Sequence, residues 1–213
     1  MKYSKLFFGW ILLVFACGPS DSGQSIACSP SDSAISITND PGWTKIKSNL
    51  YLGPKGELGF ATNPKIFNLK AAKFEMQECS NVFITSIGIN SENNTLQSEI
   101  DTATFEFLGS NFYKDKFNIY HHYAMCDGGY LNIFAKDTTS FKLLGCCYVY
   151  YNGKIFHERN GLLNADAKTF RTSVELGPAA KDKNGYFSFE TRISEEEAIN
   201  TMGEKVFNKL KDL

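Results

Sequence analysis

The sequence predicts a mainly β fold, in which antiparallel hairpin repeats form an extended or curved sheet and an amphipathic α-helix follows at the C-terminus. Short stretches rich in Tyr, Val, Ile and Phe alternate with turn residues through most of the chain, which is typical of half-buried strands. Residues 194–213 instead place apolar side chains at helical spacing. The chain has 213 residues, of which 43% are hydrophobic and 21% charged, so it is long enough for a domain and is not disordered throughout.

The charges of the chain nearly cancel. It has 22 Lys and Arg residues against 23 Asp and Glu residues, which gives a formal net charge of -1 at pH 7. A protein that holds nucleic acid through its phosphates needs a clear excess of basic side chains. We therefore expect no nucleic-acid partner.

Residues 1–16 have the pattern of a signal peptide. Lys2 and Lys5 precede an apolar stretch of 11 residues from Leu6 to Ala16. A helix of that length rises about 16 Å, which is half of the roughly 30 Å hydrocarbon core of a bilayer. The stretch therefore fits the apolar region of a signal peptide and is too short for a stable membrane span.

The end of this segment resembles the lipobox of bacterial lipoproteins, through Val14, Ala16 and Cys17. The resemblance implies that Cys17 is acylated and holds the protein on a membrane of the cell envelope. Residues 17–41, rich in Ser, Asp, Gly and Pro, would form a flexible tether. Gly18 favours the outer membrane if the source is a diderm bacterium, with the domain facing the periplasm or the exterior. The alternative is an ordinary secretory signal with an incidental Cys.

Export would place the cysteines in an oxidising compartment. If Cys17 is lipidated, five of the six remain, which permits two disulfides and one free thiol. The disulfide candidates are Cys79, Cys126, Cys146 and Cys147, and their pairing stays open. In a strand, adjacent cysteines would point to opposite faces. The chain has no C-x-x-C pair, which disfavours a structural zinc site, and no P-loop, G-x-G-x-x-G, H-E-x-x-H or EF-hand pattern, so we expect neither a metal nor a cofactor.

Residues 42–193 contain a degenerate repeat. An Asp or Asn is followed four positions later by Phe, and an Asx side chain can start a turn that leads this Phe into the core. The four Asx positions are Asn63, Asp101, Asp137 and Asp166. Asn152-Gly153 and Asn184-Gly185 supply the positive φ angles that tight hairpin turns need. Each unit thus predicts a turn, a strand, a hairpin turn and another strand.

These units resemble the DKNYY family. The resemblance lies in the segments Asp115-Lys116-Phe117-Asn118-Ile119-Tyr120, Tyr150-Tyr151-Asn152-Gly153-Lys154 and Asp182-Lys183-Asn184-Gly185-Tyr186-Phe187. The family contains many bacterial lipoproteins and has no established activity, so the resemblance implies an exported β-rich module and no particular reaction. The unit around Cys146 departs from the pattern, because it lacks the Asp-Lys pair.

The remaining elements have local signals. Residues 50–60 predict a hairpin around Pro54 to Gly56, and residues 72–90 predict two strands. Ser194 and Glu197 form a capping box, which predicts one helix over 195–211, weakened by Gly203. Its apolar face would pack on the domain, and consists of Ala198, Met202, Val206 and Leu210.

Three functions compete on this basis. The first is a lipid-anchored, non-enzymatic binding or interaction module, whose unknown ligand is an envelope protein or a glycan. The second is a glycan- or small-molecule-binding lipoprotein that uses Tyr148, Tyr150 and Tyr151 as an aromatic platform. The third is an envelope hydrolase with Cys126 as nucleophile and His121 as base. We favour the first and expect no catalytic residues, since no known catalytic motif is present.

Overall fold

The computed structural model describes residues 35–37, 42–62, 65–68, 73–76, 82–89, 94–125 and 127–213. Within these residues the protein is mainly β, as predicted, with antiparallel sheets followed by two C-terminal helices. The predicted signal peptide, nearly all of the predicted tether, and Cys17, Cys79 and Cys126 lie outside the described residues.

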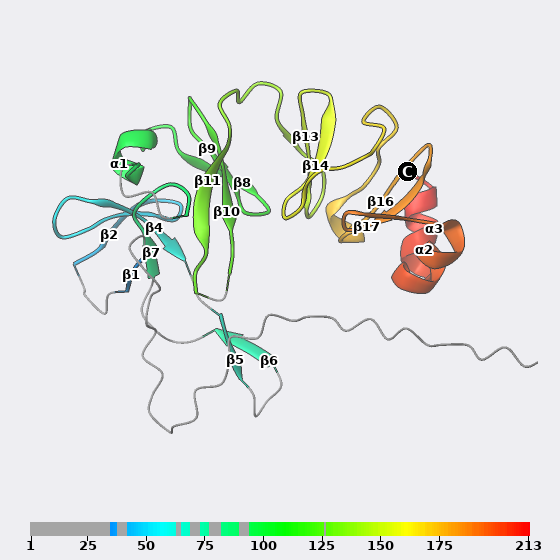
Figure 1. Ribbon diagram of the computed structural model, residues 1–213, viewed down its shortest axis with the longest axis horizontal. Helices are drawn as coiled ribbons and strands as arrows, with labels where there is room; N and C mark the ends of the chain where they lie inside the picture. The colour runs from blue at the N-terminus through cyan, green and yellow to red at the C-terminus, as the bar shows by residue number, and fades with distance from the viewer. Residues whose placement is uncertain are drawn as a thin grey trace, which may run out of the picture.

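Four sheets follow one another in a row that ends at the C-terminal helices (Figure 1). The first sheet has the strand order β1-β7-β4-β3-β2, and β5 and β6 form a separate ribbon. The strands of the first sheet are β1 (Ile35–Ile37), β2 (Thr44–Lys47), β3 (Leu50–Leu52), β4 (Leu58–Thr62) and β7 (Val82–Ile84). The ribbon consists of β5 (Lys65–Asn68) and β6 (Lys73–Met76), and α1 (Leu96–Glu99) follows β7. The hairpin predicted over 50–60 is confirmed as β3–β4, and the two strands predicted in 72–90 are β6 and β7.

In each of the other three sheets, neighbouring strands follow one another along the chain, in the orders β8-β9-β10-β11, β12-β13-β14-β15 and β16-β17-β18. The second sheet holds β8 (Glu106–Gly109), β9 (Phe112–Lys114), β10 (Ile119–Tyr123) and β11 (Tyr130–Ala135). The third holds β12 (Lys142–Leu143), β13 (Tyr148–Tyr151), β14 (Lys154–His157) and β15 (Gly161–Leu162). The fourth holds β16 (Ala179–Asp182), β17 (Gly185–Ser188) and β18 (Thr191–Ile193), preceded by the short 3-10 helix η1 (Val174–Leu176).

Two-residue turns connect the strands of the β13–β14 and β16–β17 hairpins. Asn152 and Gly153 adopt φ angles of 49° and 77° in the β13–β14 turn, as predicted. The second predicted turn lies one residue earlier than expected. Asp182 pairs with Gly185, so Lys183 and Asn184 make the β16–β17 turn and Gly185 begins a strand.

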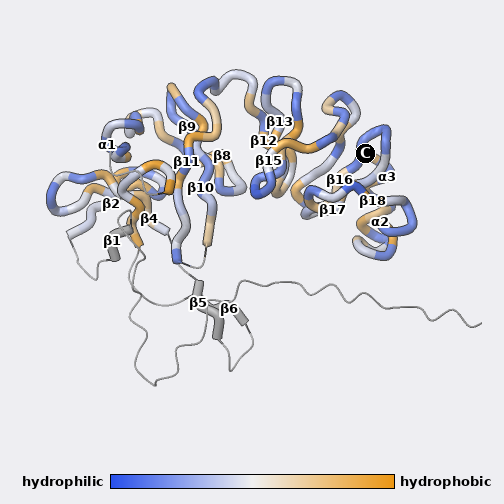
Figure 2. Tube along the Cα trace, in the orientation of Figure 1, coloured by the Kyte–Doolittle hydropathy of each residue, from blue (hydrophilic) through white to orange (hydrophobic). Residues whose placement is uncertain are grey.

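Hydrophobic clusters lie between neighbouring sheets, because alternate residues of a strand point to its two faces. Each cluster joins side chains of two successive layers. The first contains Phe60 and Ile84 with Phe105, Tyr113 and Tyr120; the next contains Phe112 and Ile119 with Val149 and Phe156. The third contains Tyr148 and Ile155 with Ala180 and Phe187, and the last contains Ala179 and Tyr186 with Val206 and Leu210. Figure 2 shows the hydrophobic residues on the strands and the hydrophilic ones at the turns between them.

The outer face of the first sheet is covered by Trp43. Its ring stacks on Phe83, with centroids 4.0 Å apart and an interplanar angle of 8°. The same ring lies across Gly59, where an added Cβ would come within 2.4 Å of it. Glycine is therefore required on this strand by the close approach of an aromatic ring.

The prediction of one C-terminal helix is wrong, because the chain forms α2 (Glu195–Met202) and α3 (Glu204–Lys211). Gly203 adopts φ 79° between them, a left-handed conformation that ends the first helix. The capping box is confirmed: Ser194 Oγ accepts from the Glu197 amide, and the Glu197 carboxylate accepts from the Ser194 amide. The predicted apolar face is also confirmed, since Ala198 and Leu210 are fully buried and the helices lie against the fourth sheet.

In the part of the chain that the structure describes, no helix has the length and apolar character needed to cross a membrane.

Candidate functional site

Two buried aspartates organise the hairpins of the second and fourth sheets. Asp115 Oδ1 accepts from the amides of Phe117 and Asn118, and its Oδ2 accepts from the Asp101 amide at 2.8 Å. The same arrangement recurs at Asp182.

Asp182 Oδ1 accepts from the Asn184 amide and its Oδ2 from the Asp166 amide, both at 2.8 Å. Each buried carboxylate thus joins its own hairpin turn to the Asx turn that begins the unit. Because charged acceptors make the stronger hydrogen bonds to backbone amides, these contacts fix both turns at once.

A threonine completes each of these networks. Thr104 Oγ1 donates to Asp101 at 2.8 Å and accepts from the Lys116 amide at 2.9 Å. Thr169 Oγ1 donates to Asp166 at 2.8 Å and accepts from the Lys183 amide at 3.0 Å.

The lysine that supplies each amide also carries an ion pair. The Lys116 ammonium lies 3.1 Å from Asp101, and the Lys183 ammonium lies 3.1 Å from Asp166. The pKa values of Asp101 and Asp166 are lowered, chiefly by the threonine hydroxyls and then by the lysines. Both Asx carboxylates are therefore held in the ionised form.

The third sheet has a reduced version of this network. Tyr151 occupies the position before the turn that Asp182 holds in the fourth sheet. Ser140 Oγ donates to Asp137 at 3.1 Å and lies 2.7 Å from Asn152 Oδ1. The missing Asp-Lys pair noted in the sequence thus corresponds to a missing buried carboxylate.

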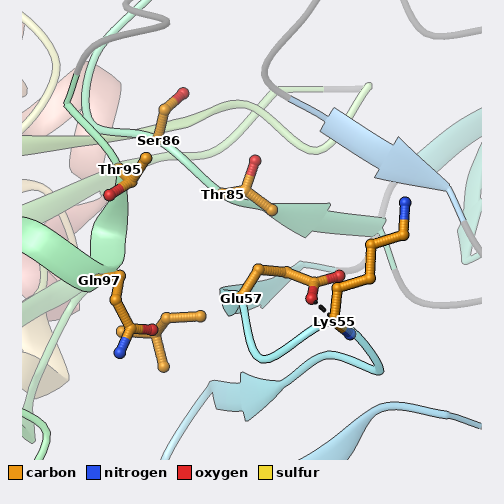
Figure 3. A pocket seen from close by; sticks show the side chains of 7 residues that line it. Lys55, Glu57, Thr85, Ser86, Thr95 and Gln97 are labelled. Carbon is orange, nitrogen blue, oxygen red and sulfur yellow. Dashed lines mark hydrogen bonds between the residues drawn. The ribbon is translucent and has the colours of Figure 1, made fainter.

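A cavity of about 540 Å³ lies beside the first sheet (Figure 3). Its lining comes from the β3–β4 turn, from the segment after β7 and from the start of α1. The lining residues are Lys55, Glu57, Leu58, Thr85, Ser86, Thr95 and Gln97. Glu57 Oε2 accepts from the Lys55 amide at 2.9 Å, which folds this carboxylate back onto its own turn. Three hydroxyls and one amide therefore provide neutral donors and acceptors around the space.

No pattern in the sequence predicts this cavity, because its lining residues come from three separate segments of the chain. The lining residues form no recognisable sequence motif. They come together only because the β3–β4 turn folds against the bridge between Ser86 and Thr95.

The three tyrosines proposed as a platform do not share a surface. Tyr148 is fully buried, and its hydroxyl oxygen lies 2.6 Å from the carbonyl oxygens of Pro178 and Phe189. Tyr150 packs in the same cluster, between the third and fourth sheets. Tyr151 packs in the cluster on the opposite face. These positions argue against ligand binding on the Tyr-rich strand.

The two adjacent histidines of β10, His121 and His122, point to opposite faces of the second sheet. His121 is buried against Phe112, with ring centroids 4.6 Å apart, and burial lowers its pKa to about 4. His122 lies near Phe60 on the other face, and its Nε2 donates to the Gly128 carbonyl at 2.8 Å. A base with a pKa this low is poorly matched to catalysis near neutral pH. Among the described residues, no three His, Cys, Asp or Glu side chains gather as metal ligands.

The expectation that Cys146 and Cys147 face opposite ways is wrong. They lie in a bend before β13, and both side chains enter the cluster between the third and fourth sheets. Their sulfur atoms are 3.2 Å apart and are not bonded to each other. Of the four disulfide candidates, only these two are described.

Comparisons with protein-family models, with curated proteins and with solved structures found no match to this chain.

Proposed function

We propose that this chain is a lipid-anchored protein of the bacterial cell envelope that acts as a non-enzymatic binding module. The lipobox-like Val14 to Cys17 and the resemblance to the DKNYY family support the anchor and the location. The cavity beside the first sheet carries the binding function, because its volume lies within the range of small-molecule sites, roughly 300–1,000 Å³.

We further infer that residues 101–193 are tandem copies of one hairpin unit, stacked into an extended, curved sheet array. The matching bonds of Asp115 and Asp182, and of Thr104 and Thr169, support this inference. Repeats of this kind bury their hydrophobic faces only against their neighbours. The array would act as a rigid support for the cavity at its N-terminal end.

The lining of the cavity indicates a polar, largely uncharged ligand. Hydroxyl and amide side chains both donate and accept hydrogen bonds, as do the hydroxyls and acetamido groups of sugars. Thr85, Ser86 and Thr95 supply hydroxyls and Gln97 supplies an amide, whereas the Glu57 carboxylate is engaged by its own turn. Lys55 adds one ammonium group, which can donate to a sugar hydroxyl. We therefore favour an envelope sugar as the ligand.

The anchor is tested by mass spectrometry of the mature N-terminus from membranes. We expect cleavage before Cys17 and a lipid-modified Cys17, and we expect Cys17→Ser to release the protein from the membrane fraction. Cleavage at another position, with Cys17→Ser still retained on membranes, would contradict the lipid anchor.

Binding is tested by calorimetric titration of the full-length, detergent-solubilised protein with two disaccharides, chitobiose and cellobiose. We expect at least one to bind, and Gln97→Ala and Lys55→Ala to weaken that binding by tenfold or more, about 1.4 kcal/mol. Lys142→Ala, on β12 away from the cavity, is the matched control. Binding of neither sugar, or equal losses in the control, would contradict the sugar site.

A further inference from the structure

We propose that Cys146 and Cys147 form a redox-active pair, which is oxidised reversibly to a disulfide between adjacent residues. This inference goes beyond the binding function and concerns the joint between the third and fourth sheets. The export that we proposed would supply the oxidant, but the geometry of the pair does not depend on it.

The two sulfur atoms are already close to bonding distance. They are 3.2 Å apart, and a disulfide requires an approach of only about 1.2 Å more. Adjacent residues in a strand would point their sulfurs apart. Here Gly145 adopts φ 93° and the chain bends through residues 145–147, so both side chains turn to the same side.

The bend is held by neighbours on several sides. The Leu144 amide donates to the Tyr148 carbonyl at 2.8 Å, which closes a loop around the two cysteines. The Cys147 carbonyl accepts from the Glu158 amide at 2.9 Å. A Cβ on Gly145 would lie 3.2 Å from the Ser173 backbone, so this position is also closely packed. The sulfurs are thus kept together by the fold, which favours reaction between them.

The two thiols are not equivalent. Cys146 is half-buried, whereas Cys147 is only 4% exposed. Burial raises the pKa of the Cys147 thiol, and its hydrogen bond with Cys146 and the carboxylates of Glu158 and Glu190 raise it further. Cys147 therefore stays protonated near neutral pH, and Cys146 is the thiol that an external reagent meets first.

The oxidant is a disulfide, either a low-molecular-weight one or that of a thiol–disulfide oxidoreductase. The Cys146 thiolate attacks it, forms a mixed disulfide and releases one thiolate of the oxidant. Cys147 Sγ, on losing its proton, then attacks Cys146 Sγ and expels the second thiolate. In total the chain loses two electrons and two protons, and the oxidant gains both and becomes two thiols.

Oxidation would act on the joint between two sheets. The new ring would include the peptide bond between Cys146 and Cys147, and the next residue is Tyr148, whose hydroxyl lies 2.6 Å from the carbonyl oxygens of Pro178 and Phe189. Both cysteines also belong to the cluster that contains Phe170 and Phe187. The redox state of the pair would therefore alter how the fourth sheet is held.

The test uses the full-length protein, treated with oxidised glutathione or with dithiothreitol, then denatured and alkylated with iodoacetamide. Trypsin releases residues 143–154, which contain these two cysteines and no other. After oxidation we expect this peptide unalkylated and lighter than the dithiol by two hydrogens, about 2 Da. Dithiothreitol should restore a doubly alkylated peptide.

Cys126→Ser is the matched control, and should leave the oxidation of this peptide unchanged. Two outcomes would overturn the proposal: a peptide that stays doubly alkylated in oxidised glutathione, or a cross-link from it to the peptide of Cys79 or Cys126. Neither outcome bears on the Cys17 lipid or on sugar binding, so failure here is separate from failure of the proposed function.

Discussion

The carboxylate of Asp182 is held by the guanidinium of Arg192 through two bonds, Nη1 to Oδ1 at 2.7 Å and Nη2 to Oδ2 at 2.9 Å. Asp115, its counterpart in the second sheet, instead accepts from the Tyr120 hydroxyl at 2.8 Å. Phe187 takes the position of Tyr120 in the fourth sheet, and Arg192 lies over its ring, 4.3 Å from the centroid. The same buried carboxylate is thus satisfied by a hydroxyl in one hairpin and by a cation in the other.

Replacing Arg192 by Ala should destabilise the protein by about 2–3 kcal/mol at pH 7, because it leaves the buried Asp182 without its cation. Burial opposes the ionisation of Asp182, but Arg192 and the backbone amides outweigh it and lower the pKa of Asp182 to about 2. Urea unfolding measures the loss, and Arg171→Ala, on an exposed arginine, is the control.

The same ion pair predicts a pH dependence. A carboxyl whose folded pKa of about 2 lies below its unfolded value, about 3.9, stabilises the fold above pH 4. That contribution is lost as the pH falls from 4 to 2. We expect unfolding free energies measured across this range to fall less steeply in Arg192→Ala than in the wild type. Parallel curves would show that the guanidinium does not set this pKa.

Removing the hydroxyl of Thr104 or of Thr169 should lower the free energy of unfolding by a similar amount in both cases. Thr104→Val and Thr169→Val each leave a lysine amide without its acceptor, which should cost about 1 kcal/mol. Thr191→Val, at an exposed position on β18, should cost much less. Chemical denaturation compares the three, and a loss confined to one of the two turns would contradict the equivalence of the units.

Gly59→Ala should displace Trp43, since the added methyl would lie 2.4 Å from the indole ring. Overpacking of this kind typically costs about 1–3 kcal/mol. Tryptophan fluorescence should shift to longer wavelength as the ring leaves Phe83. Gly56→Ala is the control for the fluorescence alone: its φ of 82° strains an alanine, but nothing lies within 4 Å of its Cβ position, so its emission should match the wild type.

Tyr148→Phe should loosen the joint between the third and fourth sheets. The change removes the hydroxyl that lies against the Pro178 and Phe189 carbonyls, at a cost of about 1–2 kcal/mol. Hydrogen exchange should quicken at the amides of β16 and β17. Tyr150→Phe is the control, because Tyr150 is a half-buried tyrosine of the same cluster. Equal exchange rates in the two variants would contradict a role of the Tyr148 hydroxyl in holding the fourth sheet.

Features fixed by local chemistry could be predicted from the sequence. The Asn152-Gly153 turn and the Ser194 cap depend on the conformations and hydrogen bonds of adjacent residues, so their residue types were sufficient. The Asx turns at Asp101, Asp137 and Asp166 were predictable for the same reason, whereas Asn63 lies outside the described residues. The β16–β17 turn was misplaced by one residue because Asp182 keeps Gly185 as its strand partner, which depends on pairing across the hairpin.

Features fixed by distant contacts could not be predicted. The bend at Cys146 and Cys147 depends on the packing of Gly145 beside Ser173, and the periodicity of the sequence does not reveal it. Gly203 was recognised as a weak point of a helix, but its left-handed conformation follows from the packing of α2 and α3 on the fourth sheet. The cavity unites three distant segments, and no motif marks its lining.

The sheets between the two ends of the row have no free face, since each shares one hydrophobic cluster with the sheet before it and another with the sheet after it. Unfolding should therefore spread inward from the termini, because opening the middle would expose two clusters to water at once. In the repeat array that we propose, a whole internal unit could be gained or lost while Trp43 and the C-terminal helices still close the two ends.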